Sequence, residues 1–464
     1  RRAAAAPVGV FTVSADTPEA LRRNLAVQAQ AVAARPRGEA AALCWTSNRV
    51  KTGLPYRAAF PACDTVELAA ALRAAAEDER LAAGIADRAW RPPVVGFLFT
   101  GQGVQEPGMT ARLYRQSPLY RRRLDEADAA LAPPLGASVR DLLLAGDPAV
   151  HRTGRAQPAL FAVGYALSAA LGDLGAGPHA VLGHSVGEFA AAVCAGALTL
   201  EQAAALVAER ARLMDALPDG GGMLSVRAGR EETAELVGDL PGVFLAAVNG
   251  PRSTVLSGAR EALERAAQVL RGHGVDCRDV AVSHAFHSPL VAPALAPFAA
   301  AADRVRPAAL RLPFASTRYG RLLADEPLDG AYWAAQAAEP VLFADALADL
   351  VAQTAPTCLV EIGPAPQLIH LAGRSGAVDG VRLLHPAPGP DAGAAELAEA
   401  VAALYRSGLE PLWDELYEPA WRRTERLPAY AFSAEHRFRA QGPAAPEAAP
   451  ARAAAPQAGP GSAE

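Results

Sequence analysis

The chain has 464 residues, of which 51% are hydrophobic and 20% are charged, and its formal net charge is −5. This length is enough for two or three domains with a sizeable buried core. The slightly acidic balance gives no reason to expect nucleic acid or an anionic membrane as a partner, and no apolar run approaches the roughly 18 residues of a membrane-spanning helix.

The start of the chain and its cysteines point to the cytoplasm. Residues 1–7 are not followed by a signal-like apolar segment, and a start without Met is expected for a piece of something longer. An odd, dispersed set of cysteines predicts reduced, mostly buried thiols, and Cys194 is expected to fill a core. We expect no metal site and no bound cofactor. The five are Cys44, Cys63, Cys194, Cys277 and Cys358.

Residues 1–92 are predicted to form a small α/β unit. A strand is expected over 8–15, and Thr17 and Pro18 are typical of the start of a long helix. A second strand is expected over 56–61 and a helix over 65–82. The run of Trp and Pro at 90–93 marks the boundary.

Residues 93–415 are predicted to form a larger α/β unit. A strand over 94–100 leads into a Gly-Gln-Gly turn, and the following alternation of helices and strands predicts a parallel sheet. Between about 222 and 287 the pattern changes to short strands that bracket helices at about 230–240 and 259–272, which predicts an inserted α+β subdomain. The short strands are expected at 222–226, 243–249 and 253–257.

The last part of the chain is predicted to lack a core of its own. After Trp421 the pattern is irregular, and residues 427–432 are typical of an extended segment that docks on another surface. We therefore expect a linker over 416–440. Residues 441–464 are rich in Ala, Pro and Gly, which predicts a flexible tail.

The most informative motif is Gly183-His184-Ser185-Val186-Gly187, between an apolar strand and an Ala-rich helix. This G-x-S-x-G pattern is typical of a nucleophile elbow, a tight turn that exposes a serine above a parallel sheet. Ser185 is therefore the predicted nucleophile. The start of the following helix favours a developing oxyanion.

A serine nucleophile needs a base, and two histidines near the end of the insert could supply it. Spacing alone leaves His284 and His287 both open. We predict His287 as the base, with His284 lining the pocket. His184 is the neighbour of the serine and is predicted to support the turn rather than to act as the base.

Backbone amides of Gln102 and Val186 are the predicted oxyanion hole. Gln102 lies between two glycines that allow close approach, although this turn does not fit a dinucleotide-binding fingerprint. Arg210 has two interpretations. It is either an ordinary surface charge on a helix, or a buried guanidinium that binds a substrate carboxylate through its planar fork.

Together, these motifs resemble the acyltransferase domain of modular type I polyketide synthases, which is related to malonyl-CoA:acyl carrier protein transacylases. The resemblance covers about residues 8–438, in family-like order. It implies an α/β-hydrolase-like domain with a small inserted ferredoxin-like subdomain, preceded by an α/β ketosynthase-to-acyltransferase linker domain at 1–92. Residues 416–440 resemble the post-acyltransferase linker.

The resemblance also implies a mechanism. Ser185 and His287 would form a dyad that takes an acyl group from acyl-CoA, through an acyl-serine, to the phosphopantetheine thiol of an acyl carrier protein. Arg210 would bind the free carboxylate of the extender unit. A ketosynthase of the same assembly is a further implied partner.

In this family, the four residues that end at the catalytic histidine correlate with the extender unit. The pattern from His284 through Phe286 to His287 is the malonyl type, and Val186 also suits malonyl. An upstream element ending at Gln157 resembles the malonyl type as well, but Arg155 replaces the usual aromatic residue. Malonyl is thus the predicted extender, with methylmalonyl or a larger α-substituted unit as the alternative.

Two other classes of function compete with this prediction. A serine hydrolase of the α/β-hydrolase type would need an acid between serine and histidine, and Asp279 is too close to His287 in sequence to be an obvious candidate. A non-catalytic docking fragment would not need the intact serine, histidine and arginine.

Overall fold

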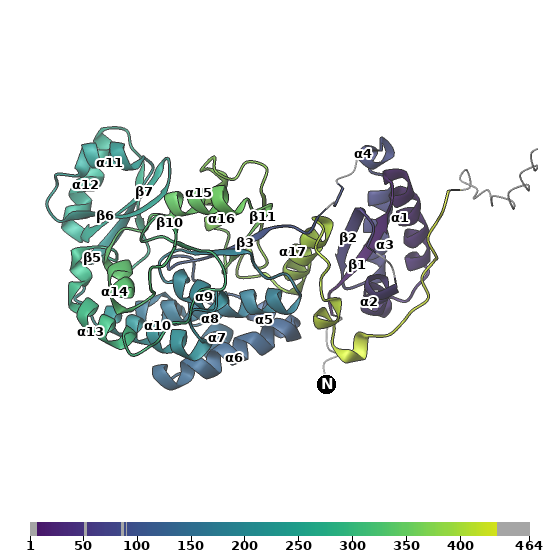
Figure 1. The fold of residues 1–464 in the computed structure, drawn as a ribbon, viewed down its shortest axis with the longest axis horizontal. Coiled ribbons are helices and arrows are strands. Elements are labelled where there is room, and N and C mark those ends of the chain that lie inside the picture. Colours follow the sequence, from purple (N-terminus) through teal and green to yellow (C-terminus); the bar gives the residue numbers. More distant parts are fainter. Residues whose placement is uncertain (1–6, 51–52, 85–87, 90, 434–464) are drawn as a thin grey trace, which may run out of the picture.

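The computed structural model describes residues 7–50, 53–84, 88–89 and 91–433. The expectations for residues 1–7 and for the tail at 441–464 therefore lie almost entirely outside it. The described residues form three sheets: a two-stranded sheet near the N-terminus, a large six-stranded sheet and a four-stranded sheet beside it (Figure 1). This agrees with the predicted fold class.

The N-terminal unit is an antiparallel pair of strands covered by helices. The helix after the first strand begins where it was predicted, because the Thr17 side chain accepts a hydrogen bond from the amide of Ala20. The elements are β1 (Gly9–Ala15), α1 (Pro18–Ala33), α2 (Ala40–Val50), β2 (Tyr56–Ala62), α3 (Thr65–Ala76) and α4 (Glu79–Ala82).

The single helix predicted over 65–82 was wrong, because α3 ends before Glu77 and α4 starts anew after Asp78. The Asp78 carboxylate accepts hydrogen bonds from the amides of Arg80 (2.8 Å) and Leu81 (3.2 Å). A side chain that satisfies the first free amides of a helix favours a new start at that residue.

The large unit is built on a mainly parallel sheet, in which only β9 and β10 are antiparallel neighbours. Side chains alternate across it, since Phe97 and Phe99 join the main core while Leu98 joins a second core on the opposite face. The strand order is β10 (Arg321–Leu322), β9 (Phe314–Ser316), β4 (Ala180–Gly183), β3 (Val95–Phe99), β11 (Cys358–Ile362) and β12 (Arg382–Leu384).

Helices cover both faces of this sheet, as a parallel sheet requires. The helices of this unit are α5 (Ala111–Gln116), α6 (Pro118–Leu135), α7 (Val139–Ala145), α8 (Thr153–Asp173), α9 (Gly187–Cys194), α10 (Leu200–Asp215), α13 (Ala292–Ala302), α14 (Gly330–Ala338), α15 (Phe343–Thr354) and α16 (Leu368–Gly373). The last helix, α17 (Ala394–Arg406), packs mainly against β2 of the N-terminal unit.

The inserted unit has the chain order β-α-β-β-α-β and the antiparallel strand order β6-β7-β5-β8, which is the ferredoxin-like arrangement. The sequence missed its last strand, because that segment is short and places Arg278 and Asp279 in solvent. The elements are β5 (Gly221–Val226), α11 (Arg230–Val237), β6 (Val243–Gly250), β7 (Ser253–Ala259), α12 (Arg260–Gly272) and β8 (Cys277–Val280).

The segment after α17 returns along the N-terminal unit (Figure 1, yellow). It has two short 3₁₀ turns, Trp413–Leu416 and Pro419–Trp421, and then no helix or strand up to residue 433. Side chains of α1 and α2 bind its backbone. The Asn24 side chain accepts from the Ala431 amide (2.9 Å), Gln28 donates to the Pro428 carbonyl (3.3 Å), and the Thr46 hydroxyl accepts from the Glu425 amide (2.9 Å).

Tyr417 belongs to this returning segment and completes the free edge of β1. Its buried hydroxyl accepts a hydrogen bond from the Val10 amide (3.1 Å) and donates one to the side chain of Asn48 (2.7 Å). The Ser47 hydroxyl accepts from the Thr12 amide (3.0 Å). Side chains thus satisfy the backbone groups that a third strand would otherwise pair.

Two further expectations can be compared with the structure. All five cysteines are free, but only Cys44 and Cys358 are fully buried, so the prediction of mostly buried thiols was too strong. Among the described helices, none has the length and hydropathy needed to cross a bilayer.

We predict that Tyr417→Phe lowers the free energy of unfolding by about 1–3 kcal/mol, because the Val10 amide and the Asn48 side chain lose a buried partner. Urea unfolding followed through the fluorescence of nearby Trp45 would measure the change. Tyr430→Phe is the matched control, since that hydroxyl has no hydrogen bond to another described residue. Equal midpoints for the two variants would contradict the prediction.

Candidate active site

The strand β4 ends in a tight turn that holds Ser185 in a left-handed backbone conformation (φ 51°). The two glycines that flank this turn, Gly183 and Gly187, have no room for a side chain. A Cβ on Gly183 would collide with the backbone of Glu188, and one on Gly187 with the carbonyl of Phe99. The predicted elbow is therefore present, and its strain raises the serine hydroxyl above the end of the sheet.

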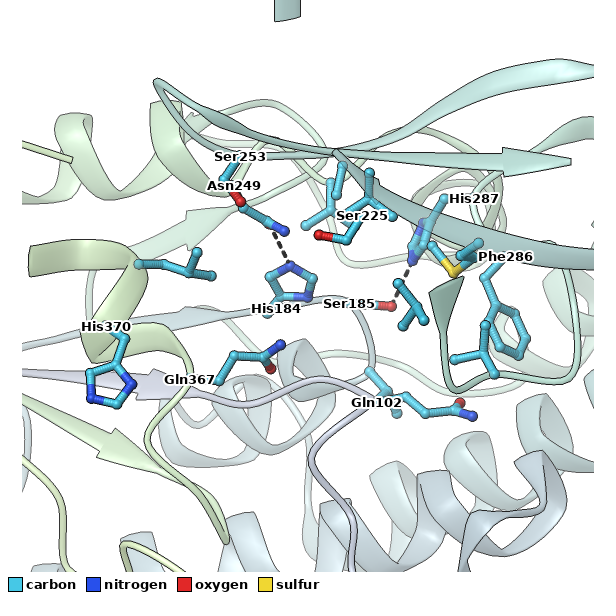
Figure 2. A pocket seen from close by; sticks show the side chains of 18 of the residues that line it. Gln102, His184, Ser185, Ser225, Asn249, Ser253, Phe286, His287, Gln367 and His370 are labelled. Carbon is cyan, nitrogen blue, oxygen red and sulfur yellow. Dashed lines mark hydrogen bonds between the residues drawn. The ribbon is translucent and has the colours of Figure 1, made fainter. Parts of the chain in front are cut away.

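Of the two candidate histidines, the structure brings His287 to the serine (Figure 2). The Ser185 hydroxyl donates to His287 Nε2 over 2.8 Å, and His287 Nδ1–H donates to the backbone carbonyl of Glu339 over 2.9 Å. The carbonyl fixes the tautomer in which Nε2 is free to accept a proton. A carbonyl occupies the place that a carboxylate has in a catalytic triad, and Asp279 does not contact His287.

Burial and, after it, the positive charge of Arg210 lower the pKa of His287 from its ordinary value to about 3. The imidazole is consequently neutral at physiological pH, which is the state that a general base requires.

His284 lies elsewhere, which corrects its predicted place in the pocket lining. Its ring is buried, with Nδ1 hydrogen-bonded to the Ser283 hydroxyl (2.8 Å) and Nε2 to the carbonyl of Leu217 (3.2 Å). It packs at a tilt against the ring of Phe286, with 5.9 Å between centroids, and thus contacts the residue that does face the cavity.

The helix α14 contacts both members of the Ser–His pair from one face. Its Gln336 side chain donates to the backbone carbonyl of Ser185 (2.8 Å), and the carbonyl that receives His287 belongs to Glu339, directly after the helix. One turn earlier, the Tyr332 hydroxyl donates to the carboxylate of Glu188 (2.8 Å). Residues at this spacing share a helix face, so a single rigid element sets the positions of serine and histidine.

Glu188 is a fully buried carboxylate in the first turn of α9. Besides Tyr332, both the amide and the hydroxyl of Thr317 donate to it, each over 2.7 Å. Burial raises its pKa to about 7 despite these donors. Its position at a helix N-terminus is favourable for a negative charge.

Arg210 lies on α10 and is 3% exposed, so the surface-charge interpretation is wrong. One guanidinium nitrogen donates to the side-chain oxygen of Gln157 (2.6 Å), and in the described part of the chain no carboxylate lies within ion-pair distance. Its Nε has no partner among the described residues. Burial lowers its pKa to about 10, and the nearby charge of Glu188 opposes that shift.

The predicted oxyanion donors also lie at the site. Gln102 and Val186 both line its cavity, and neither amide has an acceptor within the described residues. The turn approaches the elbow closely, since a Cβ on Gly101 would come within 2.6 Å of the carbonyl oxygen of His184. The side chain of Gln102 is bound elsewhere, to the Thr153 hydroxyl over 3.2 Å.

These groups surround a cavity of about 520 Å³ between the large sheet and the inserted unit. Ser185, His287 and Arg210 all line it, and Phe286 forms part of its apolar wall, whereas Gln157 acts behind it through Arg210. His184 also lines it and donates to Asn249 over 2.9 Å, which ties the elbow to the inserted unit (Figure 2).

Three contributors were not predicted: Gln336, the carbonyl of Glu339, and the buried Glu188. Gln336 and Glu339 lie about 150 residues after the nucleophile motif, and the Glu188 side chain bonds to Thr317 and Tyr332, which are also distant in sequence. Only the tertiary fold brings these groups to the site. Within the described residues there is no cluster of three or more His, Cys, Asp or Glu side chains suited to a metal ion.

Comparison with known proteins identifies the family. Residues 96–396 match the model of the acyl transferase domain. The chain is 36% identical over 443 residues to the polyketide synthase GfsB of Streptomyces halstedii, a match that covers 93% of this chain and 8% of that protein. Mycoketide-CoA synthase of Mycobacterium tuberculosis is 36% identical over 92% of this chain and 10% of its own length. The chain therefore spans a tenth or less of these relatives.

Solved structures give the same result. The acyltransferase domain from module 8 of the salinomycin polyketide synthase is 33% identical, with a TM-score of 0.76, over 88% of this chain and 98% of that one. The acyl transferase domain of SpnD, in complex with 2-(pent-4-yn-1-yl)malonyl, is 31% identical with a TM-score of 0.77, over 88% and 97%. The chain thus belongs to the acyl transferase domain family and is similar to the acyltransferase domains of polyketide synthases.

Proposed function

We propose that this chain transfers a carboxylated extender acyl group from acyl-CoA, through an acyl-Ser185 intermediate, to the phosphopantetheine thiol of an acyl carrier protein. This proposal depends on two features of one cavity: a 2.8 Å hydrogen bond between Ser185 and His287, and a buried Arg210 that pairs with no carboxylate of the described residues. The Ser–His pair can form an acyl-enzyme, and Arg210 can select an acyl group that has a free carboxylate.

In the acylation step, Ser185 Oγ attacks the thioester carbonyl carbon while its proton passes to His287 Nε2. The amides of Gln102 and Val186 donate to the oxyanion of the tetrahedral intermediate. The intermediate collapses as the C–S bond breaks, and the leaving thiolate takes the proton from His287. The carbonyl of Glu339 stabilises the transient imidazolium through Nδ1–H.

In the transfer step, the same groups act in reverse. The carrier thiol gives its proton to His287 and its sulfur attacks the acyl-serine ester. The C–O bond breaks, and Ser185 Oγ recovers the proton. No net oxidation or additional reactant is needed.

Arg210 has both features that carboxylate recognition requires. Its fork is planar and can bind two oxygens at once, and it is held in place by Gln157. The unpartnered Nε leaves a donor for the ligand. A buried cation without a partner is costly, and a substrate carboxylate would remove that cost.

Malonyl is the extender that we propose. Phe286 is 6% exposed, packs with Met214 and Val291 and lines the cavity, so its ring is held in place there. In the proposed complex this ring takes up the space that an α-substituent would need. Excluding one methyl group is worth only about 1–3 kcal/mol, so a methylmalonyl or larger extender stays the alternative.

The assignment of segments is part of the same proposal. Residues 1–92 would be the ketosynthase-to-acyltransferase linker, 93–415 the acyltransferase domain with the insert at 222–287, and 416–440 the post-acyltransferase linker. Partners in a cytoplasmic assembly would be a carrier protein and a ketosynthase. Asn24, Gln28 and Thr46 of the N-terminal unit bind the backbone of the returning segment. These contacts support the proposal that the two linkers are held against each other.

We expect Ser185→Ala to abolish the malonyl adduct, which adds about 86 Da to the protein when the acyl group replaces the hydroxyl hydrogen. The adduct is measured by intact-protein mass after incubation with malonyl-CoA. His287→Ala is expected to slow adduct formation by about 10²–10⁴-fold. Ser407→Ala, remote on the end of α17, is the control. An adduct that survives Ser185→Ala would disprove the mechanism, and rapid release of free acid that carrier protein cannot divert would favour a hydrolase.

Arg210→Ala is expected to reduce discrimination between malonyl- and acetyl-CoA by about 2–5 kcal/mol, a factor of roughly 30 to 5,000 in kcat/KM. Arg210→Lys keeps the charge but loses the fork, so its discrimination should be intermediate. Circular dichroism would verify that both variants are folded. Unchanged discrimination would remove Arg210 from substrate recognition.

Phe286→Ser should raise kcat/KM for methylmalonyl-CoA relative to malonyl-CoA by about 10–200-fold, because space opens for the α-methyl group. Phe286→Leu retains most of the bulk and serves as the matched control. Competition between the two thioesters, analysed by mass of the acyl-enzyme, gives the ratio. A wild-type preference for the branched extender would overturn the assigned role of Phe286.

A further inference from the structure

A chain of hydrogen bonds leads away from the turn that contains Gln102. The Gln102 side chain donates through Nε2 to the Thr153 hydroxyl over 3.2 Å, and that hydroxyl lies 3.1 Å from the hydroxyl of Ser283. The Ser283 hydroxyl is 2.8 Å from His284 Nδ1, and His284 Nε2 is 3.2 Å from the backbone carbonyl of Leu217. We call Gln102, Thr153, Ser283 and His284 the Gln102 network.

The two ends of the Gln102 network set the direction of every hydrogen bond in it. The Leu217 carbonyl only accepts, and a neutral imidazole has one donor and one acceptor nitrogen. His284 therefore donates through Nε2 and accepts at Nδ1 from Ser283. At the other end the amide nitrogen of Gln102 only donates, so Thr153 accepts from Gln102 and donates to Ser283. Hydrogen bonds that point in one direction polarise and strengthen one another.

Thr153 is the fully buried first residue of α8, and its position is fixed by the end of α10. Asp215, the last residue of α10, accepts hydrogen bonds from the Gly154 amide (3.1 Å) and from the side chain of Arg152 (3.2 Å). A Cβ on Gly154 would come to 3.0 Å from the Asp215 carboxylate, so the two helix ends are in close contact there. The Thr153 hydroxyl is therefore a fixed point to which a mobile side chain can be bound.

The turn that contains Gln102 depends on such bonds for its orientation. It is flanked by Gly101 and Gly103, and Gly103 has a φ of 123°, so the backbone itself is permissive. Two side-chain hydrogen bonds hold it. The Gln105 side chain accepts from the Gly103 amide over 2.7 Å, and the Gln102 side chain binds Thr153. The Gln102 amide lies between these two points and has no acceptor among the described residues.

We propose that Thr153 is a positioning residue of the oxyanion hole, which holds the Gln102 amide in place through the Gln102 side chain. The inference rests on the proposed function, because it takes that amide as an oxyanion donor. Thr153 does not line the cavity, so it acts through Gln102 and not on the substrate. Ser283 and His284 precede His287 in the chain, and the network thus connects the oxyanion donor with the segment of the base.

An oxyanion donor acts when negative charge develops, so its misplacement should slow the chemical steps and leave substrate binding unchanged. Thr153→Val replaces the hydroxyl by a methyl group of similar size. We expect it to lower the rate constant for acylation of Ser185 by malonyl-CoA by about 10–100-fold, since removal of a whole donor costs about 10²–10³-fold. Transfer from acyl-Ser185 to free pantetheine should slow by a similar factor. Rapid quenching and intact-protein mass measure both rate constants.

Binding and rescue distinguish this role from a merely structural one. In the Ser185→Ala protein, Thr153→Val should change the Kd of malonyl-CoA by less than about twofold, measured by calorimetry. Thr153→Ser restores the hydroxyl and should recover the acylation rate to within about threefold of wild type. Thr65→Val is the matched control, because Thr65 is a buried first residue of α3 in the N-terminal unit and donates to the Arg35 carbonyl over 3.1 Å. Partial unfolding would lower the fraction of protein that is acylated and not the rate constant.

Gln102→Met tests the route of the effect, because it removes the side-chain donor and keeps the backbone amide. In that background Thr153→Val should slow acylation by less than about threefold further. Independent effects of the two substitutions would overturn the proposal. So would equal rates for Thr153→Val and Thr65→Val, a slow Thr153→Ser protein, or a loss of malonyl-CoA affinity that accounts for the slower reaction. A wild-type protein that forms no malonyl adduct would refute the proposed function, and this inference with it.

Discussion

The close contact between β4, the Ser185 turn and α9 is the constraint on which the site depends. Gly183 and Gly187 let the strand and helix approach until only hydrogen fits, and this forces Ser185 into a left-handed conformation. The cost of that conformation is met by the surrounding core, since the residues on both sides of the turn are buried. A looser turn would lower the hydroxyl into the sheet edge.

The second ordering element is α14, which coordinates parts of the chain that are more than a hundred residues apart. It binds the Ser185 carbonyl through Gln336, and the carbonyl that follows it orients His287. A base oriented by a carbonyl needs no acidic third member. The absence of an obvious acid between Ser185 and His287 in the sequence is therefore compatible with an intact proton relay.

Local sequence was sufficient for features with local causes. The elbow around Ser185 and the helix after Thr17 could be predicted, because steric limits and capping act within a few residues. The interruption between α3 and α4 was missed, because the surrounding sequence is rich in Ala and favours helix throughout, so the capping role of Asp78 was not recognised. Burial of Arg210 could not be derived from the residues, and spacing alone left both His284 and His287 open although His287 was the predicted base, because both features depend on how distant helices pack.

Arg210 and His287 interact electrostatically across the same cavity, and the positive charge of the first lowers the pKa of the second. In the proposed reaction, a substrate carboxylate that pairs with Arg210 cancels part of this effect and thereby strengthens the base. An acyl group without an acid leaves the imidazole a weaker acceptor. Arg210 would thus discriminate between acyl groups twice, first when the substrate binds and again in the chemical step. The reactivity of Ser185 would then depend on whether the bound acyl group has a free carboxylate.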